Sequence, residues 1–363
     1  MTQTTSSPTT VLLLCGGRSD EHNVSLASAR SVITALTEVS ADTSDIPRVI
    51  PIVIDRTGNL YSAEASAQII LEERDIAPHD ALLTADEAVT EHGLSNLETL
   101  IGELEVDVVF PLLHGPYGED GSVQGLLQLL DLPYVGAGIL ASALGMDKLA
   151  MKAAFFAAGL PQVAYQAVTR FDWQLAPEMV IERLSPLGYP LFVKPANLGS
   201  SVGISKVEDE SSLWDALGLA ATFDRRIIVE EAVTARELEV GVLGNDEPAA
   251  SPVGEILYDS DFYDYDTKYS ADKARLQIPA DLDDATTSQC RTLALDAFNA
   301  VGAQGLARVD FFLTDRGRLF VNEINTMPGF THTSMYPKLW EAAGYNYRDL
   351  IVELVRLAFD SHH

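Results

Sequence analysis

Three short apolar runs constrain the fold of this chain most strongly. They are VLLLCGG at 11–17, RVIPIVID at 48–55 and VDVVFPLL at 106–113. Continuous apolar runs of this length are typical of strands that are buried on both faces of a parallel sheet. With helices between them, the first from about Asn23 to Glu38, they predict an N-terminal parallel α/β domain.

The middle of the chain predicts a second α/β unit. A helix is expected behind Asp120 as its cap, and another from about Ile139 to Ala158, ending before a glycine and a proline. The unit that follows has these expected elements in order: a strand at 189–195, a Gly/Ser loop, a strand at 203–207, an acidic helix near 209–220 and a strand at 226–233.

The last third predicts antiparallel strands and a long polar loop. Strands are expected at 237–244 and 251–257, followed by a polar loop at 258–275, a helix, and a hairpin at 308–325. Long loops without structure of their own are often lids over active sites. Four tyrosines within 258–269 weigh against a plain disordered insertion there.

Composition excludes several classes of function. The net charge of −29 argues against a nucleic-acid surface, which needs a basic stripe. Two cysteines are too few for a disulfide framework, so we expect a reducing, cytoplasmic compartment. The first ten residues lack the order of a signal peptide, and no apolar window is long enough to span a membrane.

The hairpin at 308–325 gathers unusual side chains on one face. Arg308 and Asp310 lie two apart in one arm, and Glu323 and Asn325 lie two apart in the other. Because side chains alternate along a strand, each pair should share a face. A solvated edge face is one interpretation. The apolar flanks favour a second, in which the oxygens bind Mg²⁺ and Arg308 holds an anion such as phosphate.

A phosphate site also needs cations and backbone N–H groups. The stretch KPANLGSSVG at 194–203 supplies Lys194 and a Gly/Ser loop whose amides could surround phosphates, although the loop alone could be an ordinary turn. Lys148 is either a second cation or an exposed helix lysine. Glu230 and Glu237 could accept hydrogen bonds from an adenine amine and a ribose hydroxyl, or could be surface acids.

The chain resembles the D-alanine–D-alanine ligase family of the ATP-grasp superfamily. The resemblance covers almost the whole chain. It is specific because several motifs occur together and in the order typical of the family. The motifs that carry it are GGRSDEHNVS, HGPYGEDGSVQG, MDK, KPANLGSSVG, FYDYDTKY, GLARVDFF and NEINTMPGFTHTSMYP.

This resemblance implies the fold and the reaction. The fold would be α/β with ATP-grasp architecture. A parallel, substrate-binding domain (1–145) would be joined to two α+β domains that enclose the nucleotide: a central subdomain with the Gly/Ser loop (146–228) and a catalytic domain with the lid loop (229–363). ATP would phosphorylate the carboxylate of one D-alanine, and the amine of a second D-alanine would attack the acyl phosphate. ATP and two Mg²⁺ ions, with Mn²⁺ as a substitute, and a homodimer are also implied.

The resemblance further implies roles for individual residues. Catalysis and substrate binding would involve a first set: Glu21, His114, Ser200, Tyr269, Arg308, the N–H of Gly329, Ser334 and the amide of Met335. ATP would contact a second set: Lys148, Lys194, Ser201, Glu230, Glu231, Val233, Glu237, Lys268 and Asn322. Two metal ions would be held by a third set: Asp310, Glu323 and Asn325. Tyr269 would contact Ser200 and, through it, Glu21 when the lid closes.

Two other functions compete with this interpretation. A D-alanine–D-lactate ligase would use the same scaffold, but the related enzymes lack the Lys-Tyr pair that stands here at 268–269. A nucleotide-binding regulator without catalysis is also open, although the expected metal ligands and lysines are all present. A dinucleotide-binding dehydrogenase is excluded because no GxGxxG follows the first strand.

Overall fold

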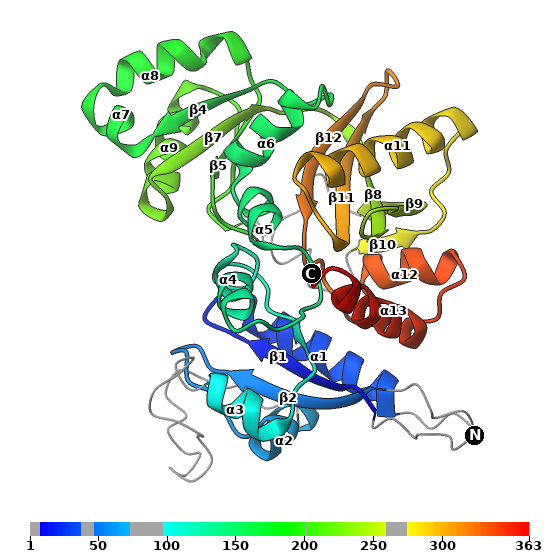
Figure 1. The fold of residues 1–363 in the computed structure, drawn as a ribbon. Coiled ribbons are helices and arrows are strands. Elements are labelled where there is room, and N and C mark those ends of the chain that lie inside the picture. Colours follow the sequence, from blue (N-terminus) through cyan, green and yellow to red (C-terminus); the bar gives the residue numbers. More distant parts are fainter. Residues whose placement is uncertain (1–7, 38–46, 73–96, 200–201, 259–273, 363) are drawn as a thin grey trace, which may run out of the picture.

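The computed structural model describes residues 8–37, 47–72, 97–199, 202–258 and 274–362, and its named strands form three sheets (Figure 1). Each sheet belongs to one segment of the chain. The α/β fold class expected from the sequence is confirmed.

The N-terminal sheet is parallel, with strand order β2-β1-β3. Its strands are buried apolar runs, as the sequence predicted, and helices pack against them. The elements are β1 (Thr10–Gly16), α1 (His22–Thr37), β2 (Arg48–Ile54), α2 (Ala63–Leu71), α3 (Leu97–Leu104), β3 (Val108–Pro111) and α4 (Ser122–Leu129).

The central sheet is antiparallel, in the order β4-β7-β5-β6. Helix α9 packs on it over an apolar core, and the capping box at Asp209 and Ser212 starts that helix. The elements are α5 (Ile139–Met146), α6 (Lys148–Ala157), β4 (Tyr165–Thr169), α7 (Arg170–Leu175), α8 (Pro177–Leu184), η2 (Ser185–Leu187), β5 (Leu191–Pro195), β6 (Ser205–Val207), α9 (Glu210–Phe223) and β7 (Arg226–Glu231).

The C-terminal sheet is also antiparallel, in the order β10-β9-β8-β11-β12. Helix α11 packs against it over a second apolar core (Figure 1). The elements are β8 (Ala235–Gly244), β9 (Ala249–Tyr258), β10 (Ala274–Gln277), α11 (Asp284–Ala300), β11 (Gly305–Thr314), β12 (Leu319–Asn325), α12 (Met335–Ala342) and α13 (Tyr347–Asp360).

The expected long helix at 139–158 is wrong, because Asp147 divides it. Asp147 has extended backbone angles and ends α5. Its side chain accepts a hydrogen bond from the N–H of Ala150 at 2.9 Å, so it caps α6. Its other oxygen pairs with Arg226 of β7 at 2.5 Å. A single polar residue therefore starts a new helix and ties it to the central sheet.

The cap expected at Asp120 is also wrong. Gly121 is the N-cap of α4, with a φ of 91° that favours glycine. Asp120 instead accepts hydrogen bonds from the N–H groups of Tyr117 and Ser122 and shapes the preceding turn.

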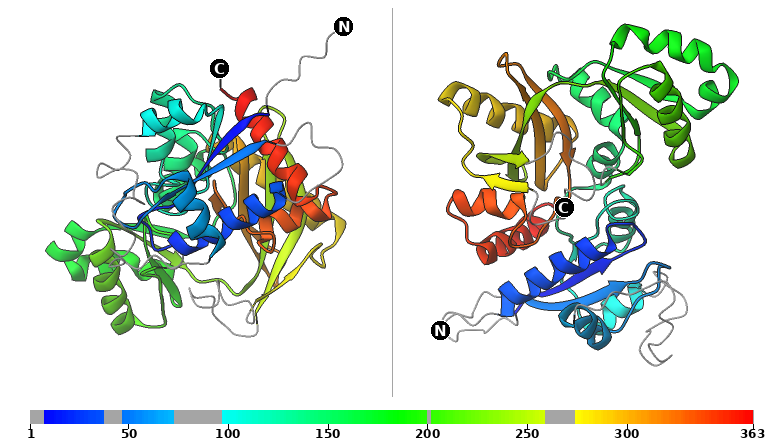
Figure 2. Two further views of the ribbon diagram at one scale, coloured as in Figure 1. Left: turned by 90° about the horizontal axis from the view of Figure 1, so that it is seen from below. Right: turned by 180° about the vertical axis from the view of Figure 1, so that it is seen from behind.

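The end of the chain returns to the N-terminal domain. Helix α13 packs against α1 and β3 and shares one apolar core with them (Figures 1 and 2). The expected boundary at 228–229 lies inside β7, which pairs throughout with β4 and β5. The central sheet thus extends to Glu231. Within the described part of the chain, no helix is both long and apolar enough to cross a membrane.

Candidate functional site

The hairpin predicted at 308–325 is formed by β11 and β12, and its register brings the two predicted pairs of side chains together. Arg308 lies opposite Asn325, and Asp310 lies opposite Glu323. On the other side of β11, Asp310 pairs with Glu239 of β8. Three neighbouring strands therefore place the carboxylates of Glu239, Asp310 and Glu323 in one row across the sheet.

Arg308 is held by two of these carboxylates. Its Nε and Nη2 donate to the two oxygens of Asp310 at 2.7 and 2.8 Å, and Nε lies 3.0 Å from Oε2 of Glu239. A bidentate pair of this kind fixes the guanidinium plane. The side chain of Asn325 donates to Asp310 Oδ2 at 3.1 Å. All four groups are buried or half-buried, so the face is not a solvated edge.

This donor set fits Mg²⁺ together with a phosphate ligand. Among the residues that the structure describes, no three His, Cys, Asp or Glu side chains converge tightly enough to hold a metal by themselves. Mg²⁺ usually takes only one or two carboxylates and completes its shell with water and substrate phosphates. Asp310, Glu323 and the amide oxygen of Asn325 supply hard oxygens of that kind. Their role as ligands stays a prediction.

A bulge brings Asn322 to the same edge. The pairing of β11 with β12 shifts between Asp310 and Phe311, so Asn322 has no partner in the ladder. Asn322 and Glu323 are both half-buried, although neighbours on a regular strand would alternate. Alternation of side chains along a strand would put Asn322 and Glu323 on opposite faces, so the sequence alone could not predict this arrangement.

The central sheet contains a second ionic cluster, and it was only partly predicted. Glu230 of β7 lies between two lysines, with Oε1 2.8 Å from Lys152 Nζ and Oε2 2.6 Å from Lys194 Nζ. Burial alone would raise the pKa of Glu230, but the two ammonium groups hold it at about 2. Lys194 was expected as a phosphate ligand, whereas Lys152 was not singled out.

Lys194 also faces the C-terminal sheet. Burial would lower its pKa, yet Glu230, Glu323 and Glu237 together raise it. The effect of Glu323 and Glu237, which lie on β12 and β8, means that this lysine is within electrostatic reach of the hairpin face. The predicted phosphate cation and one predicted metal ligand are thus brought together from two sheets.

Lys148 lies beside the start of the Gly/Ser loop. Its Nζ donates to the carbonyl of Leu198 at 2.6 Å, and its N–H donates to the carbonyl of Ala196 at 2.8 Å. This lysine is half-buried at the first position of α6, so it is not an ordinary exposed helix lysine. Ser200 and Ser201 lie outside the described residues.

The carboxylate of Glu21, the predicted ligand of the first amino group, lies between Gly115 and Gly199. A Cβ added at Gly115 would be 2.9 Å from Glu21 Oε2, and one at Gly199 would be 3.1 Å away. Gly199 opens the Gly/Ser loop, so the Glu21 carboxylate reaches that loop from the N-terminal domain. At Gly115 a positive φ of 73° also favours glycine, whereas at Gly199 a side chain would only have to displace the flexible Glu21 carboxylate.

His114 and Glu119 hold the backbone of Met327 from both sides. His114 Nδ1 donates to the Met327 carbonyl at 3.1 Å, and the Met327 N–H donates to Glu119 Oε1 at 3.3 Å. Burial lowers the pKa of His114, against the opposing effect of Glu21. Desolvation and the Glu21 carboxylate raise the pKa of Glu119 to about 8. The N-terminal domain therefore positions the loop that leads to Gly329.

The loop after β12 ends at the N-terminus of α12. Ser334 is the N-cap, and its hydroxyl contacts Thr331 Oγ1 at 2.7 Å. Gly329 lies close by, since a Cβ there would be 3.3 Å from Ser334 Oγ. Met335 is the first residue of α12, where backbone N–H groups favour an anion. This geometry agrees with the predicted carboxylate site, which stays a prediction.

The remaining predicted nucleotide contacts lie along the connection between the two antiparallel sheets. Glu231 is exposed at the end of β7, Val233 is half-buried in the connection, and Glu237 is half-buried on β8. Lys268 and Tyr269, with most of the expected lid, lie outside the described residues.

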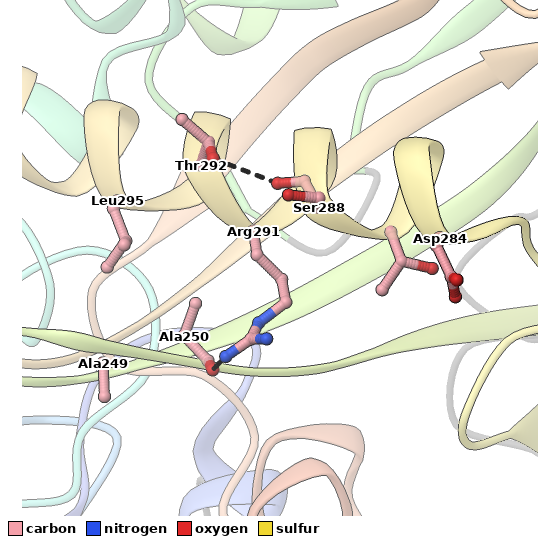
Figure 3. Close-up of a pocket in the computed structure, with 8 residues that line it drawn as sticks. Ala249, Ala250, Asp284, Ser288, Arg291, Thr292 and Leu295 are labelled. Atoms are coloured by element: carbon pink, nitrogen blue, oxygen red, sulfur yellow. Dashed lines mark hydrogen bonds between the residues drawn. The ribbon is translucent and has the colours of Figure 1, made fainter.

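An open groove of about 430 Å³ lies elsewhere, between α11 and β9 (Figure 3). It is lined by alanines of β9 and by polar side chains of α11, including Arg291, which donates to the Ala250 carbonyl at 2.9 Å. None of the predicted site residues lines it, so this groove is separate from the candidate site.

Sequence reasoning missed three charged residues of the site: Lys152, Glu119 and Glu239. Glu119 lies inside a quoted motif, and Glu239 lies two residues after Glu237, so alternation on one strand could have found it. For Lys152 the spacing of four from Lys148 on a helix was a weak signal, because such lysines are usually exposed.

Comparison with known proteins identifies the family of this chain. The sequence profile described as "D-ala D-ala ligase N-terminus" matches residues 10–137, and the one described as "D-ala D-ala ligase C-terminus" matches residues 155–356. The D-alanine–D-alanine ligase of Deinococcus radiodurans is 49% identical over 96% of this chain and 98% of its own length. That of Geobacillus thermodenitrificans is 45% identical over 98% of this chain and 96% of its own length.

Solved structures lead to the same family. VanG D-Ala:D-Ser ligase from Enterococcus faecalis superposes with a TM-score of 0.82 at 32% identity, covering 97% of this chain and all of its own. The D-alanine–D-alanine ligase from Coxiella burnetii gives 0.76 at 34% identity, covering 98% of this chain and 95% of its own. From the two matched profiles and the nearly full-length relatives, the chain belongs to the D-alanine–D-alanine ligase family.

Proposed function

We propose that this protein joins two D-alanine molecules into D-alanyl-D-alanine with ATP, a step in the supply of peptidoglycan precursors. Similarity over nearly the whole chain carries the proposal, because two proteins named as D-alanine–D-alanine ligases match it at 49 and 45% identity. The charges of the candidate site support it, since phosphoryl transfer depends on positioned cations and metal-binding carboxylates.

In the proposed reaction, a carboxylate oxygen of the first D-alanine attacks the γ-phosphorus of ATP, and ADP leaves with the electrons of the broken P–O bond. The amine of the second D-alanine, once it has lost a proton, attacks the acyl carbon of D-alanyl phosphate. The tetrahedral intermediate then expels phosphate. The chain becomes attached to neither substrate, so it contributes by binding, orientation and stabilisation of charge.

Lys148 and Lys194 are the cations proposed for the ATP phosphates, with the amides of the Gly/Ser loop beside them. Asp310, Glu323 and Asn325 would hold Mg²⁺, which would neutralise phosphate charge during transfer. The proximity of Lys194 to the hairpin carboxylates supports a single phosphate position shared by both sheets.

The two amino acids are proposed to meet at the loop before α12. Glu21 would bind the ammonium of the first D-alanine, and its position against Gly115 and Gly199 supports this. Ser334 and the N–H of Met335 would bind the carboxylate of the second at the helix N-terminus. Arg308 and the N–H of Gly329 would stabilise the oxyanion.

Substrate choice is the decisive experiment. The purified protein is given ATP, Mg²⁺ and one of four mixtures: D-alanine alone, D-alanine with D-lactate, D-alanine with D-serine, or L-alanine. ADP release and the product mass are measured. We expect D-alanyl-D-alanine as the main product. A dominant depsipeptide, or a dominant D-alanyl-D-serine as the VanG name would suggest, contradicts the proposal.

Two finer parts of the proposal have their own measurements. Two Mg²⁺ ions per active site, replaceable by Mn²⁺, should appear as the stoichiometry of metal bound in the presence of an ATP analogue. A homodimer, implied by the family resemblance, should appear as twice the chain mass of 39.3 kDa in sedimentation experiments.

A further inference from the structure

Lys152 is a buried cation for which the proposed reaction has no direct use. Its side chain is 2% exposed, and it projects from α6 onto the central sheet, with Nζ 5.5 Å from the ring centre of Tyr165. A side chain so deeply buried cannot touch a nucleotide. Burial of an ammonium group is costly unless a carboxylate pairs with it, and here that carboxylate is Glu230 at 2.8 Å.

Glu230 does not need Lys152 for neutralisation. Its second oxygen already pairs with Lys194 at 2.6 Å, and one lysine balances one carboxylate. With both lysines present, the cluster contains two ammonium groups and one carboxylate. Lys194, 12% exposed and within reach of Glu237 and Glu323, is the member of the cluster that faces the nucleotide position.

We propose that Lys152 is a positioning residue that keeps the Lys194–Glu230 pair electropositive towards the ATP phosphates. Lys152 takes one oxygen of Glu230 and compensates its charge, so Lys194 is oriented by Glu230 without being neutralised by it. This inference rests on the proposed function only in using ATP as the ligand. It adds a residue that acts through two others and touches no substrate.

The test measures binding of the phosphate part of the nucleotide and of its nucleoside part separately. Binding of two probes, magnesium tripolyphosphate and adenosine, is measured by calorimetry for the wild-type protein and for Lys152→Met. Tripolyphosphate should bind roughly tenfold more weakly to the variant, because one buried charge near the phosphates is lost. Adenosine should bind equally to both, since it has no phosphate charge.

The double variant Lys152→Met/Glu230→Gln restores the charge balance. It removes one cation and one anion, so the cluster again carries a single excess positive charge on Lys194. Its tripolyphosphate affinity should return to within about twofold of the wild-type value. The matched control is Lys206→Met, on β6 of the same sheet, where an exposed lysine pairs with Glu208. That control should bind both probes as the wild type does.

Three results would overturn the inference. Equal loss of adenosine and tripolyphosphate in Lys152→Met would mean a general structural defect, and unchanged binding of both would mean no role. If the single variant does not fold, the double variant decides: several-fold weaker tripolyphosphate binding than wild type would refute the charge argument. No D-alanine is present in these experiments, so their outcome does not depend on whether the protein is a ligase.

Discussion

The two ionic clusters described at the candidate site have opposite excess charge. In the central sheet, Lys152 and Lys194 share one carboxylate, Glu230. In the C-terminal sheet, Arg308 lies between two carboxylates, Glu239 and Asp310. Both clusters are largely shielded from water, so each charge must be compensated by a partner in the protein or by a ligand.

The difference indicates what each cluster can receive. A cluster with excess ammonium suits an anion such as phosphate, and a face with excess carboxylate suits a cation such as Mg²⁺. An ATP molecule with bound metal ions presents both signs of charge. The proposed ATP position would lie between the two clusters, because Lys194 of the central sheet is within electrostatic reach of Glu323 and Glu237 of the C-terminal sheet. Substitutions that change the charge of either cluster test this difference. The largest effect, a loss of turnover, is expected on the carboxylate face.

Removing charge from the carboxylate face should abolish turnover. Asp310→Asn or Glu323→Gln is expected to lower kcat about a thousandfold, because a lost metal ligand leaves transition-state charge uncompensated. Steady-state ADP release at saturating Mg²⁺ measures it. The matched control is Asp315→Asn in the exposed turn of the same hairpin, which should keep full activity. Near-normal rates in either variant would refute the metal assignment.

The central cluster should make stability sensitive to acid. The pKa of Glu230 is held at about 2, below the ordinary 4.5, so its contribution is complete above pH 4.5 and is lost as pH falls towards 2. The ionised carboxylate of Glu230 contributes about 3 kcal/mol to the free energy of unfolding at neutral pH. About 2 kcal/mol of this is lost by pH 3. Lys152, Lys194 and Tyr165 are the titratable groups around it.

Urea unfolding of the wild type and of Lys152→Met/Glu230→Gln, at pH 7 and at pH 3, measures this effect. The stability difference between the two proteins should shrink by about 2 kcal/mol at the lower pH. A difference that stays constant with pH would mean that Glu230 is not held ionised by the lysines.

Glu119 should have the opposite pH dependence. Its pKa is raised to about 8, so the folded protein favours the protonated form, and ionisation costs stability as pH rises from about 4.5 to 8. As pH rises from 5 to 8, the free energy of unfolding of Glu119→Gln should therefore increase by on the order of 1–2 kcal/mol relative to that of the wild type. This figure is reduced because the side chain is partly exposed.

Thermal unfolding of the wild type and of Glu119→Gln across that pH range measures the effect. The matched control is Glu98→Gln, on the exposed side of α3. The Glu98 variant should follow the wild type at every pH. If Glu119→Gln also follows it, the carboxyl group is not kept protonated by Glu21 and desolvation.

An exposed ion network should contribute the least. Arg356 pairs with Glu353 and Asp360 on the surface of α13, and all three side chains are partly or largely exposed. Arg356→Ala is expected to change the free energy of unfolding by less than about 0.5 kcal/mol and to leave kcat unchanged. A loss comparable to that of the buried clusters would mean that burial does not set the strength of these ion pairs.

Sequence alternation was sufficient to predict the hairpin face. Arg308 and Asp310 share a face of β11, and Glu323 and Asn325 share a face of β12, because strand side chains alternate with a period of two. Which residues lie opposite each other is set by the bulge next to Asp310 and not by alternation. The parallel N-terminal sheet followed from its continuous apolar strands for a similar reason. These are local rules that act over a few residues.

These local rules did not predict the helix break at Asp147 or the bulge at Asn322. The break at Asp147 depends on one side chain capping α6 while it pairs with Arg226, which is 79 residues away. The position of Asn322 depends on a shift in pairing with another strand. Neither partner can be identified from the residues near the break or the bulge.

The sequence by itself determined the family, most of the strands, and the identities of the charged groups along each strand. Only the tertiary structure decided which charges meet. Lys152 and Glu230 are 78 positions apart, yet they form a buried pair because α6 packs against β7. A lysine is exposed unless packing buries it, and electrostatic energy depends on distance and burial, which the order of residues does not specify.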